Sequence, residues 1–565
     1  MILSLDSFKK IGDALLVTLA VLLTFLAFLV FRSADDNRLF SWTWVFAGGN
    51  ASTIFLLLIL GIILAFALAR VSLFERGPIA FLFLFSFVTT AIFWSEPELI
   101  MDASRYFTQA KHLEVYGIEY FIREWGKDIA AWTDLPSIPF LYGIIFKCFG
   151  ENRIVIQIFT TLLFSGTLVL TYLIGKMLWN EEIGFSAGML LLGMPFLLTQ
   201  VPLMLVDVPT MFFLTLSIFT FMKALDQGGV PMIALASLTV FFTFFSKYST
   251  WIMLSVLGII LLVYLKKESK VTFRRAVAVL LLSGLLIGTL AILKFDVISE
   301  QIRLLLSYQK PGLGRWGESF ISTFFFQIHP FITLAAAFSL FVAFKKRDLN
   351  FIIISWLVFF VFVFEIKRIR YILPVLPLLA LMAAYGFQKV GTKELRRFVV
   401  FTIAISSLTI AIFAYLPFAC KTSAESLKKT GEYLNSNEIE IVEVFTLPFK
   451  NSLANPSVAV PLIDLFTKSK ILYQYSPELF PPPNNIETWR LRFTWEYKNP
   501  KYYTENQVQK NNILIVIISG ESHPVLPKHL EQKLKGYRVS KRFETLSDPF
   551  QYKTRVEIYT RQINL

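Results

Sequence analysis

The sequence predicts a polytopic α-helical membrane protein that ends in a soluble α/β domain, and three observations carry this prediction. Hydrophobic residues make up 55% of the 565 residues, with 58 Phe, whereas charged residues make up only 17%. Soluble chains are about 45–50% apolar even when glycine is counted. Long apolar runs recur between short basic turns, and the pattern changes to mixed helix and strand signals after about residue 418.

About thirteen apolar runs predict transmembrane helices, since a crossing needs about 20 apolar residues, with a range of roughly 17–25. They lie near residues 14–31, 53–73, 78–95, 154–173, 183–203, 208–222, 231–246, 250–265, 277–293, 328–344, 351–365, 371–388 and 399–417. The first run carries no charge and exceeds the ~7–15 residues of a signal-peptide core, so we expect it to be retained as a helix. Residues 136–149 are apolar too, but this short stretch contains Pro136 and Pro139. We expect it to lie in the interface or to re-enter the membrane rather than cross it.

The basic turns between these runs predict the orientation, because short cytoplasmic loops are enriched in Lys and Arg. If Lys9 and Lys10 are cytoplasmic and the spans alternate, most of the basic turns fall on the cytoplasmic side. These turns hold Arg70, Arg76, Lys176, Lys223, Lys266, Lys267, Lys270, Arg274, Arg275, Lys345, Lys346, Arg347, Lys389, Lys393, Arg396 and Arg397. Counting residues 136–149 as a crossing would invert every later turn. We therefore expect a multi-pass protein of the plasma membrane with a cytoplasmic N-terminus.

This topology divides the chain into three predicted parts. Residues 1–77 form an additional N-terminal transmembrane hairpin, and residues 78–417 form the main transmembrane domain, with outer loops at about 96–153 and 294–327. Residues 418–565 lie outside the membrane and form a soluble α/β domain that is large enough for a core of its own. Its helix-like AESLKKTGEYLNS is followed by the strand-like IEIVEVFTL, ILIVIIS and RVEIYT.

Charge and cysteine usage bear on the expected partners. The net charge is +14, but Lys and Arg gather in the short turns, which is typical of membrane topology and of contact with anionic membrane lipids. No nucleic-acid-binding motif is visible, so we expect no nucleic-acid partner. The two cysteines, Cys148 and Cys420, have neither metal-ligand spacing nor the density of a disulfide scaffold.

Charged residues at the outer helix ends are the candidate functional residues. The segment EIKRIRYILPVLPLL contains Lys367, Arg368 and Arg370, and the predicted topology places these cations outside, against the rule that the other turns obey. A fixed phosphate at the outer membrane surface explains them. The same face is predicted to hold Asp102, Asp134, Asp207, Lys247 and His329. Carboxylates and cations at one interface suit a reaction that removes a proton from one partner and accommodates a phosphate on the other.

Each of these residues could instead have a purely structural role. An Asp at a helix end or before Leu-Pro, such as Asp102 or Asp134, is a common cap or turn residue. A lysine at a helix end, such as Lys247, often reaches toward the head groups. His329 precedes a proline and is more often a structural histidine than a metal ligand. Asp207 lies between the apolar LMLV and VPTMFF, where burial of a carboxylate is costly, so a functional role is favoured there.

The order of these motifs resembles the polyprenyl-phosphate-sugar-dependent glycosyltransferases of the GT-C fold. It combines an outer-loop Asp after a helix, an acid-x-Pro stretch, a later Asp-x-Pro at a helix mouth, a Ser-Lys turn and the Arg370–Pro374 stretch followed by Pro377. Within this fold, the chain is most similar to the protein O-mannosyltransferases and the lipid A aminoarabinose transferases. The resemblance covers about residues 78–417 and implies a GT-C-like transmembrane catalytic domain, with the first two spans as an addition.

The resemblance also implies roles for single residues. Asp102 corresponds to the first-loop acid, the candidate general base, and Asp207 to the second catalytic acid. Lys367 and Arg370 correspond to cations beside the lipid phosphate, to which Lys247 and Arg368 are added as donor-phosphate ligands. Asp134 takes the place of a metal-binding Glu in a Glu-Lys-Pro motif, although Leu135 replaces its Lys. His329 is the second candidate metal ligand, although the resemblance supplies no counterpart for it, and the use of a divalent metal ion stays open.

The predicted function is inverting transfer of a sugar from a polyprenyl phosphate, dolichyl or undecaprenyl, to an acceptor hydroxyl on the outer face of the membrane. Asp102 accepts the proton of that hydroxyl, while the cations stabilise the departing phosphate. The acceptor is a protein, a glycan or a lipid, and the sequence does not distinguish among them. A transporter or flippase of a lipid-linked sugar, or a scaffold with a partner-binding outer domain, is the alternative. Transporters, however, place their charges near the bilayer midplane and often carry internal repeats.

Overall fold

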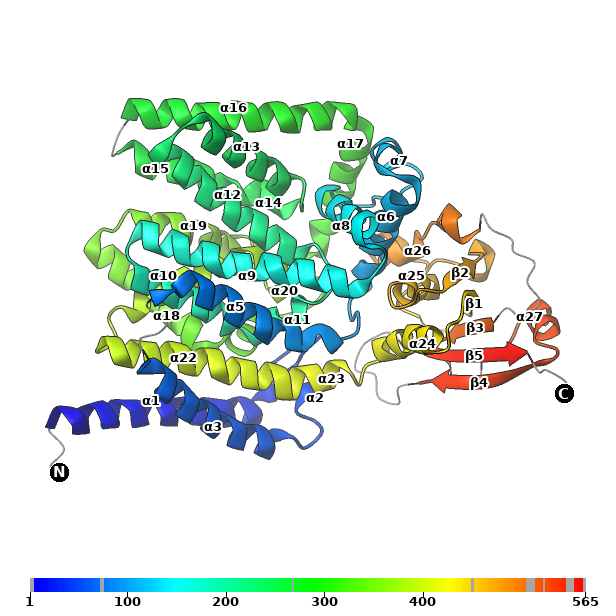
Figure 1. Cartoon of the computed structure of the whole chain (residues 1–565), viewed down its shortest axis with the longest axis horizontal. Helices are drawn as coiled ribbons and strands as arrows, with labels where there is room; N and C mark the ends of the chain where they lie inside the picture. The colour runs from blue at the N-terminus through cyan, green and yellow to red at the C-terminus, as the bar shows by residue number, and fades with distance from the viewer. Residues whose placement is uncertain are drawn as a thin grey trace.

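The chain folds into a bundle of long helices with a small α/β domain at one end of the bundle, as the computed structural model shows (Figure 1). The structure describes residues 5–71, 76–266, 269–448, 452–504, 514–521, 524–544 and 553–561. Most of the long helices run in nearly the same direction, and the α/β domain lies beyond their ends (Figure 1).

Each predicted apolar run corresponds to one or two helices of the bundle. They are α1 (Leu5–Val30), α3 (Ala51–Ala69), α5 (Pro78–Ala91), α9 (Arg153–Leu178), α10 (Glu181–Leu192), α11 (Pro195–Gln200), α12 (Asp207–Gln227), α13 (Val230–Phe244), α14 (Ser249–Met253), α15 (Ser255–Leu265), α16 (Ser269–Leu293), α18 (Pro330–Lys346), α19 (Asn350–Val363), α20 (Ile369–Ile372), α21 (Leu376–Phe387), α22 (Lys393–Ile410) and α23 (Leu416–Ala419). Several runs are interrupted. The run at 183–203 divides into α10 and α11 before Pro195, a residue that is tolerated only in the first turn of a helix.

Among the described residues, eight helices are long and apolar enough to cross a membrane. They are Gly12–Val30, Ala51–Ala69, Pro78–Ser95, Arg153–Leu178, Asp207–Gln227, Lys270–Leu293, Ile369–Phe387 and Lys393–Ala419. The predicted number of about thirteen spans is therefore not confirmed, because the remaining apolar helices are shorter. The chain is nevertheless a multi-pass membrane protein by the length and composition of these helices.

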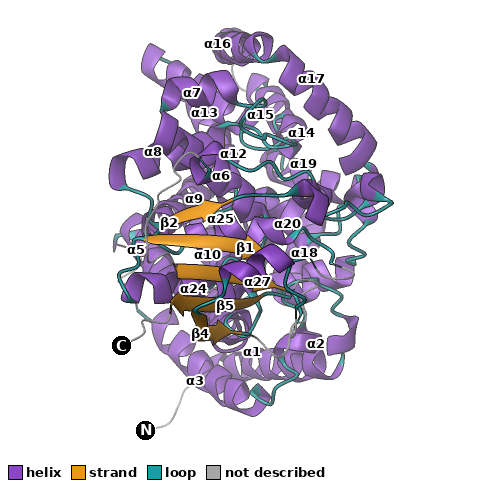
Figure 2. Cartoon of the chain, turned by 90° about the vertical axis from the view of Figure 1, so that its right-hand side faces the viewer, coloured by secondary structure: helices purple, strands orange, loops and turns teal. Residues whose placement is uncertain are grey.

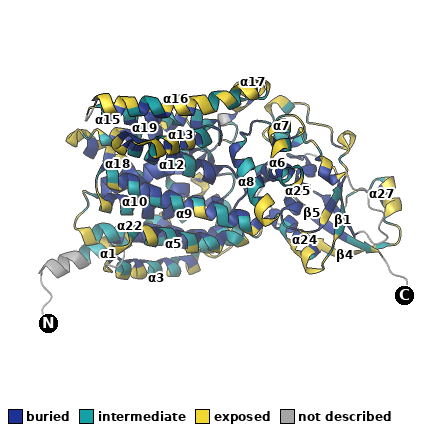
Figure 3. Cartoon of the chain, turned by 45° about the horizontal axis from the view of Figure 1, so that its top comes forward, coloured by how far each residue is buried: buried dark blue, intermediate teal, exposed yellow. Residues whose placement is uncertain are grey.

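Burial separates a central helix from the outer ones. In Ile369–Phe387, 94% of the most apolar 18-residue stretch is buried. In Gly12–Val30, only 11% of the corresponding stretch is buried. Outer helices expose large apolar side chains, including Leu16 and Phe344, and exposed residues run along α16 (Figure 3). Such surfaces are stable only in contact with lipid or another apolar partner. The segment that contains Arg370 thus lies at the centre of the bundle.

Three helices of residues 96–153, the predicted first outer loop, lie between the bundle and the α/β domain (Figure 1). These are α6 (Asp102–Tyr116), α7 (Ile118–Glu124) and α8 (Ser137–Phe149). The last of them covers the short apolar stretch that we expected not to cross, and it packs against α6 through Tyr142 and Phe146 in a shared core. The second outer loop forms α17 (Phe295–Leu304) and short helical turns, among them η5 (Ser322–Ile328).

The C-terminal domain contains a five-stranded sheet of order β2-β1-β3-β5-β4 (Figure 2). The strands are β1 (Ile441–Thr446), β2 (Lys470–Tyr473), β3 (Leu514–Ser519), β4 (Tyr537–Phe543) and β5 (Arg555–Arg561). β1 pairs in parallel with β2 and β3, whereas β5 is antiparallel to β3 and β4. The helix α24 (Ala424–Ser436) and the strands β1, β3 and β5 confirm the predicted elements. β2 and β4 were not predicted, because neither stands out from its surroundings as an apolar run.

The α/β domain shares one hydrophobic core with the first outer loop. This core joins Phe107 of α6 and Phe146 of α8 to Leu427 of α24 and Val442 of β1. Lys111 on α6 adds an ionic contact, with Nζ 2.7 Å from Oδ2 of Asp464 at the end of α25 (Ala459–Asp464) and 2.9 Å from Oε2 of Glu151. The domain is therefore fastened to the helix that begins with Asp102.

Cys148 tests the predicted orientation of the membrane protein. It is exposed at the end of α8, close to the α/β domain end of the bundle. If this end faces outward, a membrane-impermeant maleimide will label Cys148 in sealed right-side-out vesicles, as measured by gel shift or mass spectrometry. A Cys148→Ala variant, which keeps Cys420, is the control. Labelling that requires permeabilised vesicles contradicts the orientation.

Candidate active site

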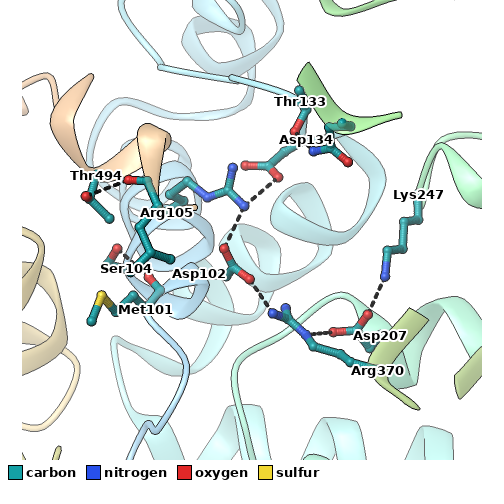
Figure 4. A network of polar contacts seen from close by, with 12 residues as sticks. Met101, Asp102, Ser104, Arg105, Thr133, Asp134, Asp207, Lys247, Arg370 and Thr494 are labelled. Atoms are coloured by element: carbon teal, nitrogen blue, oxygen red, sulfur yellow. Dashed lines mark hydrogen bonds and ion pairs between the residues drawn. The ribbon is translucent and has the colours of Figure 1, made fainter. Parts of the chain in front are cut away.

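Six charged side chains of alternating sign form a continuous chain of ion pairs at the domain-facing end of the bundle (Figure 4). We call them the charge chain. In spatial order they are Lys247, Asp207, Arg370, Asp102, Arg105 and Asp134. Three cations and three carboxylates leave this group without net formal charge.

The inner half of the charge chain surrounds Asp207, whose side chain is 0% exposed. This residue begins α12, where the helix dipole favours a negative charge. Its Oδ1 is 2.5 Å from Lys247 Nζ, in the turn between α13 and α14, and its Oδ2 is 2.9 Å from Arg370 Nε. Both oxygens of this buried carboxylate are therefore paired with a cation.

The outer half is arranged along one face of α6. Asp102, Arg105 and Gln109 follow the i, i+3, i+7 spacing that places side chains on one side of a helix. Arg370 donates from Nη1 to Oδ2 of Asp102, and Arg105 Nη2 lies 3.0 Å from Oδ1 of Asp102. The same Nη2 is 3.3 Å from Oδ1 of Asp134, and Gln109 Nε2 donates to Oδ2 of Asp134 at 3.0 Å. Arg105 thus connects the two carboxylates.

The two outer carboxylates have opposite shifts of pKa. Burial alone would raise the pKa of Asp102, but the guanidiniums of Arg370 and Arg105 outweigh it and hold that pKa below its ordinary value. Burial dominates at Asp134, where it raises the pKa to about 6 although Arg105 opposes the shift. Asp102 is therefore ionised throughout the physiological range.

The charge chain opens into a cavity of about 1540 Å³. Lys367 and Arg368 line this cavity, and Arg368 lies with its guanidinium 3.9 Å from the centre of the Trp316 ring and with Nε 3.8 Å from Oε1 of Glu318. Apolar side chains of α14, α19 and their surroundings also line it, including Ile252, Met253, Leu357, Phe360, Val361 and Phe364. The cavity therefore combines a cationic, carboxylate-containing wall with an apolar wall.

The α/β domain contributes one side of the same cavity. Phe493, in α26 (Arg492–Trp495), lines it together with the preceding Leu491. The Arg105 guanidinium lies 4.2 Å from the centre of the Phe493 ring. Nearby, Trp132 Nε1 donates a hydrogen bond to Oε2 of Glu496 at 2.6 Å. The site is therefore built jointly by the outer loops, the helix ends and the C-terminal domain.

The structure brings together most of the predicted site residues. Asp102, Asp134, Asp207, Lys247 and Arg370 belong to the charge chain, and Lys367 and Arg368 line its cavity. His329 is not among the described residues that line this cavity. It caps α18 instead, where its Nδ1 accepts a hydrogen bond from the Phe331 N–H at 3.3 Å.

Arg105 and Gln109 were not singled out from the sequence. The i+3 spacing in MDASRYFTQ does indicate that Asp102 and Arg105 share a helix face. Nothing local, however, indicates that Asp134 reaches the same guanidinium from a loop outside that helix.

The residues present do not fit a divalent metal ion between Asp102 and Asp134. All four of their carboxylate oxygens already face side-chain N–H groups, from Arg105, Arg370 and Gln109. Within the described residues, no group of three or more His, Cys, Asp or Glu could hold a metal ion. The structure does not bring His329 to the cavity that Asp134 lines, and the role of these two residues as metal ligands stays a prediction.

Comparisons with known proteins confirm the GT-C resemblance expected from the sequence. A family model described as Dolichyl-phosphate-mannose-protein mannosyltransferase matches residues 134–293. ArnT from Cupriavidus metallidurans bound to Undecaprenyl phosphate is 10% identical, with a TM-score of 0.52 over 85% of this chain and 98% of that chain. The apo state of the same ArnT is 12% identical, with a TM-score of 0.50 over 86% and 98%.

A third similar structure is archaeal oligosaccharyltransferase AglB from Archaeoglobus fulgidus, in complex with an inhibitory peptide and a dolichol-phosphate. It is 12% identical, with a TM-score of 0.48 over 80% of this chain and 70% of that chain. No curated protein sequence matches the chain. At these low identities, the likeness to ArnT concerns the fold.

Removing Arg370 tests whether the charge chain stabilises the protein. An Arg370→Ala variant leaves the fully buried Asp207 with Lys247 alone, and loss of one partner from a buried ion pair costs about 3–5 kcal/mol. We expect a clearly lower Tm in detergent. An Asp207→Asn, Arg370→Gln double variant should recover part of this loss, because the fully buried residue 207 then carries no charge that lacks a partner. Arg303→Ala, at an exposed position of α17, is the matched control. An unchanged Tm in Arg370→Ala contradicts the assignment.

Proposed function

We propose that this protein is a membrane glycosyltransferase that transfers a sugar from a polyprenyl phosphate to an acceptor hydroxyl. The observation that carries the proposal is the single cavity in which Lys247, Arg368 and Arg370 share a wall with Asp102, next to apolar side chains. A polyprenyl phosphate sugar needs cations for its phosphate, an apolar surface for its chain and a base near its anomeric carbon. The matching family model, and the Undecaprenyl phosphate bound to an ArnT of similar fold, support this choice of donor.

The donor phosphate is proposed to bind at the cationic wall. Lys247 carries three N–H donors, and its contact with Asp207 uses one of them. Arg368 and Lys367 lie in the same cavity and bring further positive charge. Hydrogen bonds from ionised donors to a phosphate are about twice as strong as neutral ones. These cations stabilise the negative charge that gathers on the phosphate as the bond to the sugar breaks.

Asp102 is proposed to act on the acceptor. Of the three carboxylates in the charge chain, its side chain is the most exposed, at 18%, compared with 5% for Asp134 and 0% for Asp207. Each carboxylate oxygen has two lone pairs, so an acceptor hydroxyl can bind beside Arg105 or Arg370. The hydroxyl oxygen then forms a bond to the anomeric carbon and its proton passes to Asp102. The carbon–oxygen bond to the phosphate breaks with its electron pair, so a single displacement inverts the configuration.

Asp207 is proposed to hold the cations rather than to accept the proton. Both of its oxygens are engaged, and its side chain has no solvent-exposed surface. By pairing with Lys247 and Arg370 at once, it fixes their positions before the donor arrives. Such preorganisation removes the cost of reorienting these groups during the reaction.

The direction of the site follows from the predicted topology. The charge chain lies at the end of the bundle that faces the α/β domain, and the basic turns predict that this end is extracytoplasmic. A lipid-linked donor with its head group on that side reaches the cavity from the membrane. The charges lie at helix ends rather than at mid-helix positions, which favours an enzyme over a transporter.

An assay with purified protein and radiolabelled polyprenyl phosphate sugars tests the proposal. Wild type should release free polyprenyl phosphate when an acceptor is present. Asp102→Asn should lose about 10²–10⁴-fold of this activity, because a positioned base typically contributes that much.

Asp296→Asn is the matched control for that assay, since Asp296 is an exposed acid at the start of α17 and lies outside the charge chain. It should keep the activity of wild type. Full activity of Asp102→Asn would falsify the role of Asp102. Movement of the intact donor across liposomes without bond cleavage would instead establish a flippase.

A further inference from the structure

The position of Arg105 carries an inference about how the site uses positive charge. We propose that the guanidinium of Arg105 takes the place of a divalent metal ion between Asp102 and Asp134, so that the site works without such an ion. The catalytic half of this inference rests on the proposed function, whereas the ion-binding half does not.

The first argument is geometric. A single nitrogen, Arg105 Nη2, lies 3.0 Å from one Asp102 oxygen and 3.3 Å from one Asp134 oxygen. Arg105 Nη2 therefore fills the space between these two oxygens, and an ion held by both carboxylates would have to take the same space. A guanidinium and an ion cannot occupy this space together.

The second argument concerns how firmly Arg105 is held. Its side chain is only 17% exposed, and its guanidinium lies 4.2 Å from the Phe493 ring centre and 6.0 Å from that of Trp132. Cation–π contact stabilises the guanidinium at this position. The rings come from the α/β domain and from the first outer loop, so Arg105 is enclosed from two sides and does not merely reach in from the surface.

The third argument concerns the missing ligands. A divalent ion binds through oxygens that are free to ligate it, but Arg105 already holds one oxygen of each carboxylate. The second oxygen of Asp102 is paired with Arg370, and that of Asp134 with Gln109. His329, the other candidate ligand, is not among the residues that line the cavity in the described part of the chain.

The fourth argument is the balance of charge. The charge chain holds three cations and three carboxylates, so it is neutral as it stands. A divalent ion beside Arg105 would add repulsion between like charges, which disfavours both. Without Arg105, in contrast, Asp102 and Asp134 would face each other with one negative charge in excess. Loss of this single side chain should therefore create an ion site.

Mn²⁺ titration followed by electron paramagnetic resonance tests this inference on the purified full-length protein in detergent. Wild type and Asp134→Asn should bind equal amounts of Mn²⁺, because neither has a site at this point. Arg105→Ala should gain one bound ion, with an affinity at least about tenfold above wild type. Asp134→Asn in the Arg105→Ala background should remove the gain. Arg303→Ala, at an exposed position of α17, is the matched control and should bind as wild type does.

If Arg105→Ala does not fold, Arg105→Lys provides the test instead. It retains a cation at the site and should bind no more Mn²⁺ than wild type. One Mn²⁺ bound by wild type and lost in Asp134→Asn overturns the inference, as does a well-folded Arg105→Ala that gains none.

In the transfer assay, dialysis of wild type against EDTA should leave the rate unchanged. Inactivation by EDTA with recovery on adding Mn²⁺ also overturns it. Absence of transfer under every condition would count against the proposed function, while the binding results would still decide the ion site.

Discussion

The rest of the site depends on the neutralisation of one buried carboxylate, that of Asp207. A carboxylate without exposed surface at the mouth of a membrane helix is stable only with close cationic partners. Lys247 and Arg370 provide them from two other segments, so three separate parts of the bundle converge on this point. Arg370 extends the pairing to Asp102, and Arg105 extends it to Asp134. Each group of the charge chain is therefore paired with the one before it.

The α/β domain takes part in this arrangement rather than standing apart from it. Its core is continuous with the helices of the first outer loop, and Lys111 on α6 lies between Asp464 of the domain and Glu151. Asp102 and Arg105 lie on the same helix as Lys111, so the helix that positions the charged groups is the one that the domain holds. Phe493 completes the contact at the cavity itself. A change in how the domain docks would thus move Asp102 and Arg105.

Sequence reasoning found the parts of the site that reveal themselves locally. An Asp inside an apolar run, such as Asp207, is an anomaly that a single sequence displays, and so is a cation that the predicted topology places outside against the positive-inside rule, such as Arg370. The helical nature of each apolar run was predicted in the same way. The number of crossings was not confirmed, because prolines and breaks such as that before Pro195 divide the runs into shorter helices.

The remaining features arise from contacts between distant segments. Arg105 looked like an ordinary helix residue, and only the fold brings Asp134 and Phe493 to it. His329 looked like a candidate ligand, yet the fold uses it as a helix cap. Strands β2 and β4 are short or polar, so their place in the sheet is set by pairing with β1 and β5 rather than by their own pattern.

Native mass spectrometry of the purified protein tests the central claim most directly, because it measures the mass of any lipid that is bound to the protein. The account predicts a bound species with the mass of a polyprenyl phosphate on wild type. A variant that combines Lys367→Ala with Arg368→Ala should lose most of it, while Arg303→Ala should retain it. Retention of the same lipid by the double variant, or a wild type that binds only bulk phospholipids when polyprenyl phosphate is supplied, would contradict the account.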